Sequence, residues 1–334
     1  MLWPMPETTI DTAVRDLSDR DRAVREAAER RLLALGVRGI ERLLPHLPDR
    51  SVKGVLMRLG DEALPRLREI RRQGPGRLRG RALELLVDLA GADALDEADQ
   101  AAVERLIQVK LPHEHPVKLP WEAGRWLAFP AERMDDAVAA LGLHDLRPVT
   151  TVLGVEATTR AEDCLEFQDA RGEKRTAYRV FITPEFESWL SEVPIRSWRM
   201  VWGNSLIDQL DGFRLADVLS ERCGEAHLYI LDPYNSAENW YVSRDGRGVR
   251  SFGTYDYPHF AGEPLPFEAW YQETAFDEEE AAKYAEGVPD ALTAADNLSV
   301  EPGLMRDDLT HGHGWLATTE AEVPNSRFRG ALPV

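Results

Sequence analysis

The sequence of 334 residues contains few cysteines and lacks the segments that would direct a protein to a membrane. Its two cysteines, Cys164 and Cys223, lie far apart in the chain, which favours two reduced, buried thiols over a disulfide. Residues 1–6 lack a basic segment followed by an apolar run, and no stretch approaches the roughly 20 apolar residues of a transmembrane helix. These absences predict a cytoplasmic protein that makes no membrane contact.

Familiar catalytic patterns are also missing. The sequence contains no G-x-S-x-G motif, no P-loop and no dinucleotide-binding fingerprint, and neither cysteine lies in a protease signature. Glutamates flank aromatic residues or prolines at 185–187 and 263–268, but carboxylates are common enough to meet by chance. The sequence therefore favours a protein that is not an enzyme and needs no cofactor, while leaving catalysis open.

Two His-x-His pairs, His113/His115 and His311/His313, are the nearest approach to a metal motif. Two imidazoles on one side of an extended segment suit a divalent metal, and the two pairs could hold one ion if they met. Prolines surround the first pair and glycines the second, which indicates a surface loop and a tight turn. We predict no metal site, and whether the pairs approach each other stays open.

Basic residues are outnumbered, and the deficit is confined to the second part of the chain. The totals are 40 Lys and Arg against 58 Asp and Glu, for a net charge of −18. Residues 1–110 carry 20 basic against 19 acidic residues, which leaves 20 against 39 for residues 111–334. Such an acidic region repels nucleic acid and anionic lipid, and it attracts basic protein surfaces or cationic small molecules.

Amphipathic helices account for the first part of the chain. Asp19–Gly36 predicts a helix because Val24, Ala28 and Leu32 share one face and the terminal glycine can adopt the left-handed conformation of a C-cap. Apolar stripes of the same kind recur in the segments 40–47, 51–59, 63–67 and 78–89.

The stretch D-x-x-x-x-V-R-x-x-A-x-x-x-L-x-x-L-G at Asp19–Gly36 resembles the first helix of a HEAT repeat. Gly60, followed by Ala63-Leu64-Pro65, is placed like the entry to the second helix of that family. The resemblance covers about the first 110 residues, with units spaced more tightly than the usual ~40 residues. It implies a right-handed stack of antiparallel helical pairs that presents a concave surface for partners, and whose last apolar face must be covered. We therefore expect residues 1–110 to form a HEAT-like α-solenoid packed on the following domain.

Arginines are concentrated near the end of this region, with Glu69 as the one opposing charge. The positions are Arg66, Arg68, Arg71, Arg72, Arg77, Arg79 and Arg81. The favoured interpretation is a solvated helix face. The alternatives are docking onto the acidic domain and contact with a phosphate-bearing ligand, including nucleic acid, which the total charge disfavours.

The remaining chain predicts a proline-rich connector at 111–130, an α+β domain with a mainly antiparallel sheet at 131–323, and a tail at 324–334. Expected strands are 150–155, 166–168, 176–183, 198–202, 226–231, 240–243 and 249–252, and expected helices are 130–142, 206–223, 276–284 and 287–298. Residues 184–190 suggest a turn or a short helix, and Asp-Gly at 245–246 predicts a type I′ hairpin.

Aromatic residues next to carboxylates make the acidic domain the candidate binding region. Such rings more often fill cores, but those outside strand patterns suit a basic or cationic partner. The candidate binding residues are Trp202, Asp232, Tyr234, Trp240, Tyr255, Asp256, Tyr257 and His259. The leading hypothesis is a non-enzymatic protein that binds a basic protein partner, for example an immunity protein that blocks a toxin. The alternative is a small-molecule function, as a binder or an enzyme, in an aromatic pocket within residues 198–271.

Overall fold

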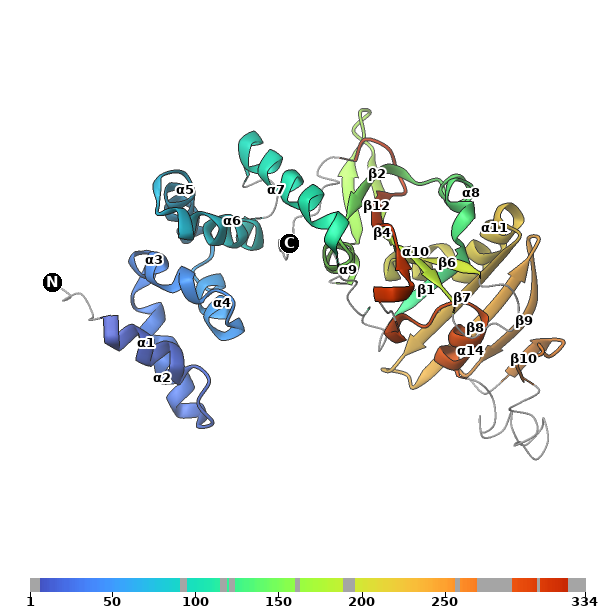
Figure 1. Ribbon diagram of the computed structural model, residues 1–334, viewed down its shortest axis with the longest axis horizontal. Coiled ribbons are helices and arrows are strands. Elements are labelled where there is room, and N and C mark those ends of the chain that lie inside the picture. The colour runs from blue at the N-terminus through green and yellow to red at the C-terminus, as the bar shows by residue number, and fades with distance from the viewer. Residues whose placement is uncertain are drawn as a thin grey trace. The chain divides into compact units, whose positions relative to one another are not determined.

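The computed structural model describes residues 7–90, 95–114, 119, 124–159, 163–188, 196–255, 259–268, 290–304 and 307–323. The described chain divides into two compact units, residues 7–105 (unit 1) and residues 106–323 (unit 2), each of which we describe by itself. Figure 1 shows helices alone in unit 1 and a large sheet with helices in unit 2. Within these described ranges, no helix combines the length and apolar character needed to cross a bilayer.

Unit 1 consists of α-helices joined by short 3-10 turns. The α-helices are α1 (Glu7–Asp16), α2 (Arg22–Leu33), α3 (Ile40–Leu43), α4 (Arg50–Met57), α5 (Leu64–Gln73), α6 (Gly76–Ala90) and the first part of α7 (Glu97–Lys110). The 3-10 turns are η1 (Gly36–Gly39), η2 (Leu44–His46) and η3 (Gly60–Ala63). These elements confirm helices at the predicted segments, whereas their stacking as a HEAT-like solenoid stays a prediction.

The same local chemistry delimits α2 and α4. The Asp21 carboxylate accepts a hydrogen bond from the Ala23 backbone N–H at 2.8 Å, and Asp49 accepts one from Ser51 at 2.8 Å. Each such N-cap contributes about 1 kcal/mol. After each helix, a glycine takes the left-handed conformation, with φ of 55° at Gly36 and 57° at Gly60. A side chain at either position would be strained, so these glycines fix where the two helices end.

An aliphatic core holds unit 1 together. Its fully buried members come from α1 to α6 and the turns between them: Ala13, Ala28, Leu32, Ile40, Leu43, Leu44, Leu47, Val52, Leu56, Ala63, Leu67, Ala82, Leu85 and Leu86. The stripes predicted from sequence periodicity therefore converge on one cluster, and burying each leucine contributes about 1.5–3 kcal/mol.

Unit 2 is built on an antiparallel sheet. The described strands form one 12-stranded sheet with the order β10-β9-β8-β7-β1-β6-β4-β12-β2, to which β3 adds at β4, and β5 with β11 adds at β6. The strands are β1 (Arg125–Pro130), β2 (His144–Val149), β3 (Cys164–Gln168), β4 (Lys174–Ile182), β5 (Glu185–Glu187), β6 (Ser197–Trp202), β7 (Glu225–Asp232), β8 (Ala237–Arg244), β9 (Arg247–Gly253), β10 (His259–Gly262), β11 (Thr310–His311) and β12 (Gly314–Thr318). The predicted mixed α+β class is confirmed.

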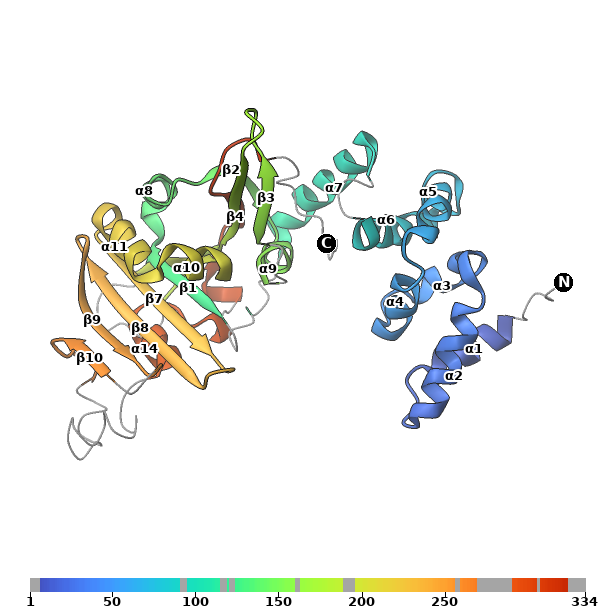
Figure 2. The same ribbon diagram turned by 180° about the vertical axis from the view of Figure 1, so that it is seen from behind.

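Helices cover both faces of the sheet, as Figures 1 and 2 show from opposite sides. α8 (Met134–Ala140), α10 (Asn204–Leu210) and α11 (Gly212–Cys223) pack on one face, over a core that includes Leu127, Val180, Val201 and Leu228. α14 (Ala291–Leu298) contacts β7 and β8 from the other face, and α9 (Thr151–Thr159) contacts β4 and β12. The remaining 3-10 turns are η5 (Leu111–His113), η7 (Ala131–Arg133), η8 (Pro302–Leu304) and η9 (Asp307–Leu309).

The prediction of a strand at 150–155 is wrong, because Thr151–Thr159 forms α9. A short apolar run does not distinguish a buried strand from a buried helix by periodicity. A Cβ added to Gly154 would lie 2.1 Å from the Phe181 ring, so this glycine lets the helix lie directly on β4. The Glu114 carboxylate also accepts a hydrogen bond from the Thr151 N–H at the start of the helix.

Three further expectations need correction. Part of the expected connector 111–130 is β1, a central strand between β6 and β7, whose buried residues give an apolar run without alternation. Residues 185–187 form β5 instead of a turn or helix, because they pair with β6. The single helix expected at 206–223 is broken at Asp211, where φ is 64° and the chain turns from α10 into α11.

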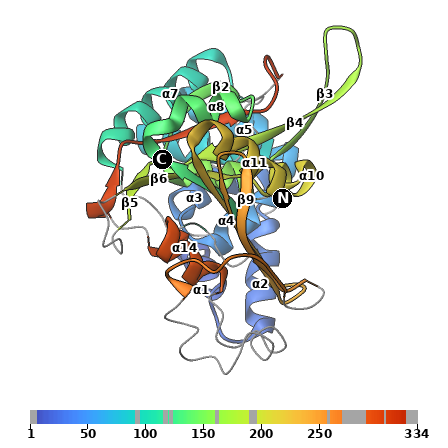
Figure 3. The same cartoon turned by 90° about the vertical axis from the view of Figure 1, so that its right-hand side faces the viewer.

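The hairpin predicted at Asp-Gly 245–246 is confirmed. Asp245 and Gly246 both have positive φ, of 48° and 77°, as a type I′ turn between β8 and β9 requires. The strands β3 and β4 form a second hairpin, which projects from the rest of the sheet in Figure 3. Cys164 on β3 is an exposed free thiol, so the expectation of two buried cysteines is correct for Cys223 alone. Burial raises the pKa of Cys223 to about 11, which keeps that thiol protonated.

Candidate functional site

Asp232 organises the end of β7, where the chain turns toward β8. Its Oδ1 accepts hydrogen bonds from the backbone N–H groups of Tyr234 and Asn235 at 3.1 and 3.2 Å. Its Oδ2 accepts from the Asn235 side-chain amide at 2.8 Å and from the Tyr255 hydroxyl at 3.1 Å. These bonds, led by that from the Asn235 side chain, lower the pKa of Asp232 and keep the carboxylate ionised.

Two tyrosines that donate hydrogen bonds to this carboxylate also reach solvent. Tyr234 is 92% exposed and Tyr255 is 43% exposed, so among the described residues both present aromatic surface. Arg125 joins the cluster through Asp208 on α10, with 2.5 Å between Nε and Oδ1, and through Asp232 at 3.9 Å. We call Arg125, Asp208, Asp232, Tyr234 and Tyr255 the Asp232 edge, which carries two carboxylates against one guanidinium.

The predicted binding residues divide into two groups. Asp232, Tyr234 and Tyr255 do meet, at the Asp232 edge. Asp256 and Tyr257 lie outside the described residues, and only the backbone of His259, the first residue of β10, is described. The sequence missed Arg125 and Asp208, because the first was assigned to a connector and the second to a continuous helix.

Trp202 and Trp240 do not belong to an exposed site, because both side chains are fully buried. Trp202 stacks on Trp126 with ring centroids 5.8 Å apart, and Trp126 stacks on Tyr229 at 5.2 Å. Trp240 packs between Phe252 and Phe267, at 6.4 and 6.0 Å. The aromatic pocket expected within residues 198–271 is, at these positions, a filled core layer.

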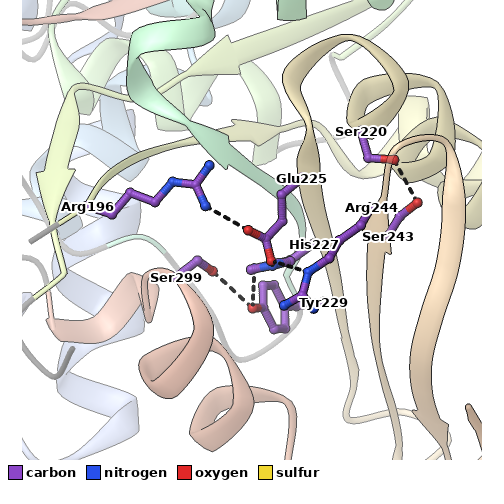
Figure 4. Close-up of polar contacts among 8 residues, drawn as sticks. All are labelled: Arg196, Ser220, Glu225, His227, Tyr229, Ser243, Arg244 and Ser299. Atoms are coloured by element: carbon purple, nitrogen blue, oxygen red, sulfur yellow. Dashed lines mark hydrogen bonds and ion pairs between the residues drawn. The ribbon is translucent and has the colours of Figure 1, made fainter. Parts of the chain in front are cut away.

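A row of buried polar side chains lies on the sheet face that also carries Trp126 and Trp240 (Figure 4). The hydroxyl oxygens of Ser299 and Tyr229 are 3.0 Å apart, and the Tyr229 hydroxyl lies 3.2 Å from His227 Nδ1. His227 Nε2 lies 3.2 Å from Glu225 Oε1. With a neutral imidazole, the Nε2–H donates to Glu225 and Nδ1 accepts from Tyr229, which in turn accepts from Ser299. Every group in the row then has a partner.

Electrostatics keep His227 neutral and Glu225 charged. Complete burial lowers the pKa of His227, and this effect outweighs the attraction of Glu225. Burial tends to raise the pKa of Glu225, but the hydrogen bond from His227 and the charge of Arg244 lower it to about 2. Arg196 adds a second guanidinium at 2.7 Å from Glu225, opposite Arg244 at 3.0 Å (Figure 4).

Many enzymes that act through a nucleophile use a carboxylate, an imidazole and a hydroxyl hydrogen-bonded in that order. Here His227, Tyr229 and Ser299 are all buried, so no substrate reaches the hydroxyl groups in this arrangement. The row instead ties β7 to Ser299, which directly follows α14. Its sequence signal was the alternation Glu225, His227, Tyr229 on one strand face, which the prediction of a buried strand left unused.

A second polar cluster fixes α11 to the β8–β9 hairpin. The Ser220 and Ser243 hydroxyls are 2.8 Å apart, as Figure 4 shows, and Gly246 N–H donates to Ser220 at 2.9 Å. Asp217 accepts from the hydroxyls of Ser243 and Tyr241 at 2.5 and 2.8 Å. These bonds satisfy buried hydroxyls, so the cluster is structural.

The second histidine pair splits between two environments. His311 on β11 lies 3.0 Å from Glu187 on β5, at the surface. His313 packs against the Trp315 ring at 4.8 Å, and burial lowers its pKa with a further contribution from Arg199. His115 lies outside the described residues. In the described part of the chain, no group of three or more potential ligands is placed to hold a metal ion.

Most of the clustered arginines are held within unit 1. Arg66 pairs with Glu41 and Glu69, each at 2.6 Å. Arg71 and Arg72 on α5 reach Asp99 and Asp96, at 2.6 and 3.1 Å, and so fasten α5 to the start of α7. Arg81 pairs with Glu84 at 3.0 Å, and Arg79 donates to the Gly74 carbonyl at 2.8 Å. The solvated-face interpretation thus needs correction for Arg66 and Arg71, which link α5 to α3 and α7. Arg72 and Arg81 keep exposed side chains, and the Arg81 pair lies within α6.

Comparison of the chain with known family models, with curated proteins and with solved structures found no significant match. The function is therefore argued from the chemistry of the described side chains.

Proposed function

We propose that unit 2 is a binding module for a protein with a basic surface, and that the Asp232 edge lies at the centre of the contact. The observation that carries this proposal is the 92% exposure of Tyr234, in the turn whose backbone N–H groups bind the ionised Asp232. Exposed tyrosines are frequent anchors of protein interfaces, and carboxylates beside them favour lysine and arginine. The acidic balance of residues 111–334 adds long-range attraction for such a partner.

We further propose that unit 1 acts as a HEAT-like scaffold and that the protein works in the cytoplasm without catalysis. One version of this function is an immunity protein that blocks the basic active cleft of a toxin. The acidic net charge supports it, because charge complementarity accelerates and selects such partners. A toxin gene beside the coding sequence in the source genome would be expected in that case.

Site-specific crosslinking tests the proposal. A photo-crosslinking amino acid replaces Tyr234 in the full chain, and the control places it at Asp169 in the turn between β3 and β4. Irradiation in the native extract at physiological salt should join position 234, and not position 169, to one basic protein. Added lysozyme, a generic basic protein, should not compete. Equal labelling from both positions, or competition by lysozyme, would contradict recognition at the Asp232 edge.

Substitutions then ask whether the edge contributes affinity for the protein captured in this way. Tyr234→Ala and Asp208→Asn should each weaken binding about tenfold, which corresponds to about 1.4 kcal/mol. The matched control is Asp169→Asn, which removes the same charge elsewhere on unit 2 and should change the affinity less than twofold. An equal loss in all three variants would show that net charge, and no defined surface, attracts the partner.

A further inference from the structure

Unit 1 contains a cavity of about 590 Å³ that the proposed function of unit 2 does not use. Its walls come from α1, the α3 region and the start of α6. The lining residues are Ile10, Asp11, Arg38, Glu41, Arg42, Pro45, His46, Pro75, Arg77 and Leu78. Its volume lies within the roughly 300–1,000 Å³ of small-molecule sites.

One acidic residue of the lining already faces a cation, because Glu41 lies 2.6 Å from Arg66. Asp11 lies 3.7 Å from the His46 imidazole. The lining contains three arginines, Arg38, Arg42 and Arg77, against these two acids, so its balance of charge is positive.

Arg38 and Arg77 differ from the other arginines of their neighbourhood. Both are exposed, and in the described ranges neither makes an ion pair or a side-chain hydrogen bond. Arg66, Arg71 and Arg72 are by contrast tied to carboxylates on other helices. Two guanidinium groups without internal partners thus line one cavity, although they are 39 positions apart in the sequence.

Four apolar residues also contribute to the lining. Ile10 and Leu78 are core residues whose buried side chains border the cavity, and Pro45 and Pro75 add rigid apolar surface. A free inorganic ion would leave this surface unused. A ligand with both an anionic group and an organic body would match both parts of the lining.

We propose that this cavity binds a small phosphorylated organic molecule, with its phosphate held by Arg38 and Arg77 and its organic body against the two prolines. Guanidinium groups match phosphate oxygens through paired N–H donors, and two of them balance the charge of a phosphate monoester. Arg42 also lines this cavity.

Calorimetric titration of the full chain with phenyl phosphate tests the inference. Phenyl phosphate should bind saturably with one site per chain, more tightly than inorganic phosphate and more tightly than benzoate at equal ionic strength. Arg38→Gln and Arg77→Gln should each weaken it about tenfold, or about 1.4 kcal/mol. Arg68→Gln is the matched control, because Arg68 is an exposed arginine of the same cluster outside the cavity lining, and it should change affinity less than twofold.

Two further measurements keep the outcome decisive. Thermal unfolding followed by circular dichroism should show the same midpoint for all three variants as for the wild type, because the replaced side chains are exposed. Arg77→Lys, which keeps the charge but loses the paired donors, should bind with intermediate affinity. The inference is overturned by a lack of saturable binding, by equal binding of benzoate, or by an equal loss in Arg68→Gln. Binding of a single-stranded oligonucleotide alone, with steep salt dependence that Arg77→Gln leaves unchanged, would overturn it as well.

Discussion

The two units place their polar side chains differently. The buried polar residues of the described chain, including Arg179, His227, Arg250 and Glu268, all belong to unit 2. Unit 1 has an aliphatic core, and most of its ion pairs are open to solvent, apart from the pair of Lys53 with Asp88, whose side chain is 6% exposed. Helices satisfy their own backbone and need only an apolar stripe to assemble, so unit 1 requires few buried polar contacts. The stability of unit 1 should therefore depend on packed volume, and that of unit 2 also on polar pairing.

The largest expected effect is the loss of a buried ion pair in unit 2. Arg250 and Glu268 are each 3% exposed, with 2.6 Å between Arg250 Nη2 and Glu268 Oε2. Arg250→Met should lower the free energy of unfolding by about 3–5 kcal/mol, because it leaves a buried carboxylate without its cation. Urea unfolding followed by tryptophan fluorescence measures this loss of stability in unit 2. The signal comes mainly from that part of the chain, because Trp3 is the sole tryptophan before residue 121.

The control for Arg250 is an exposed pair in the same unit. Arg175 lies 2.8 Å from Glu320, and both side chains are partly open to solvent. Arg175→Met should change the free energy of unfolding far less than Arg250→Met does, because solvent screens an exposed pair. Equal effects of the two substitutions would contradict the contrast between buried and surface pairing.

A cavity in the core of unit 1 should have the next largest effect. Leu44 is completely buried, and Leu44→Ala should lower the free energy of unfolding by about 2–5 kcal/mol through lost contacts and residual cavity volume. Circular dichroism at 222 nm should follow the change, because unit 1 is helical. Arg50→Ala, an exposed position on α4, should stay within about 0.5 kcal/mol of the wild type.

Acidification should destabilise unit 2 through His227. The pKa of the buried imidazole is lowered, so below pH 6.5 the unfolded chain takes up a proton that the folded chain does not. The free energy of unfolding should therefore fall as the pH drops below 6.5, by up to about 1.4 kcal/mol per pH unit from this group. Urea unfolding at pH 7.5, 6.0 and 5.0 measures the slope, and His227→Gln should reduce it. An unchanged slope in that variant would exclude His227 as its source.

A smaller effect is expected at the helix cap of α4. Asp49→Ala removes the acceptor for the Ser51 N–H and should lower the free energy of unfolding of unit 1 by about 1 kcal/mol. Asp61→Ala removes an exposed aspartate from η3 and should change it by less than about 0.5 kcal/mol. Thermal unfolding at 222 nm distinguishes the two, and equal shifts would exclude a capping role.

The smallest effect on stability is expected at the Asp232 edge. Tyr234→Ala should change the free energy of unfolding by no more than about 0.5 kcal/mol, because the ring is exposed. The sequence analysis placed Trp240 in the same site. Trp240→Ala should nevertheless lower the free energy of unfolding by about 3–5 kcal/mol, because that ring fills the core. Fluorescence-detected urea unfolding of the two variants separates a surface residue from a core residue. Similar losses would contradict the division of the predicted site.

Sequence reasoning located part of the site and misplaced the rest for identifiable reasons. Asp232 and Tyr234 are near neighbours in the chain, so their juxtaposition follows from local turn geometry. The partners Arg125 and Asp208 come from β1 and α10, and only the pairing of β1 with β7 and the packing of α10 on β1 bring them there. For Trp202 and Trp240, composition indicated aromatic density but not which face of the sheet helices would cover.

Local chemistry alone determined the helix limits of unit 1 and the β8–β9 hairpin, because aspartate caps, glycines of positive φ and apolar stripes act over a few residues. The tertiary structure decided which tryptophans are buried, which arginines have partners, and that Glu225, His227 and Tyr229 meet Ser299 from 70 positions away. Contacts of that kind depend on how strands pair and which helix covers them. Such pairing is set by the burial of the whole sheet and not by any one segment.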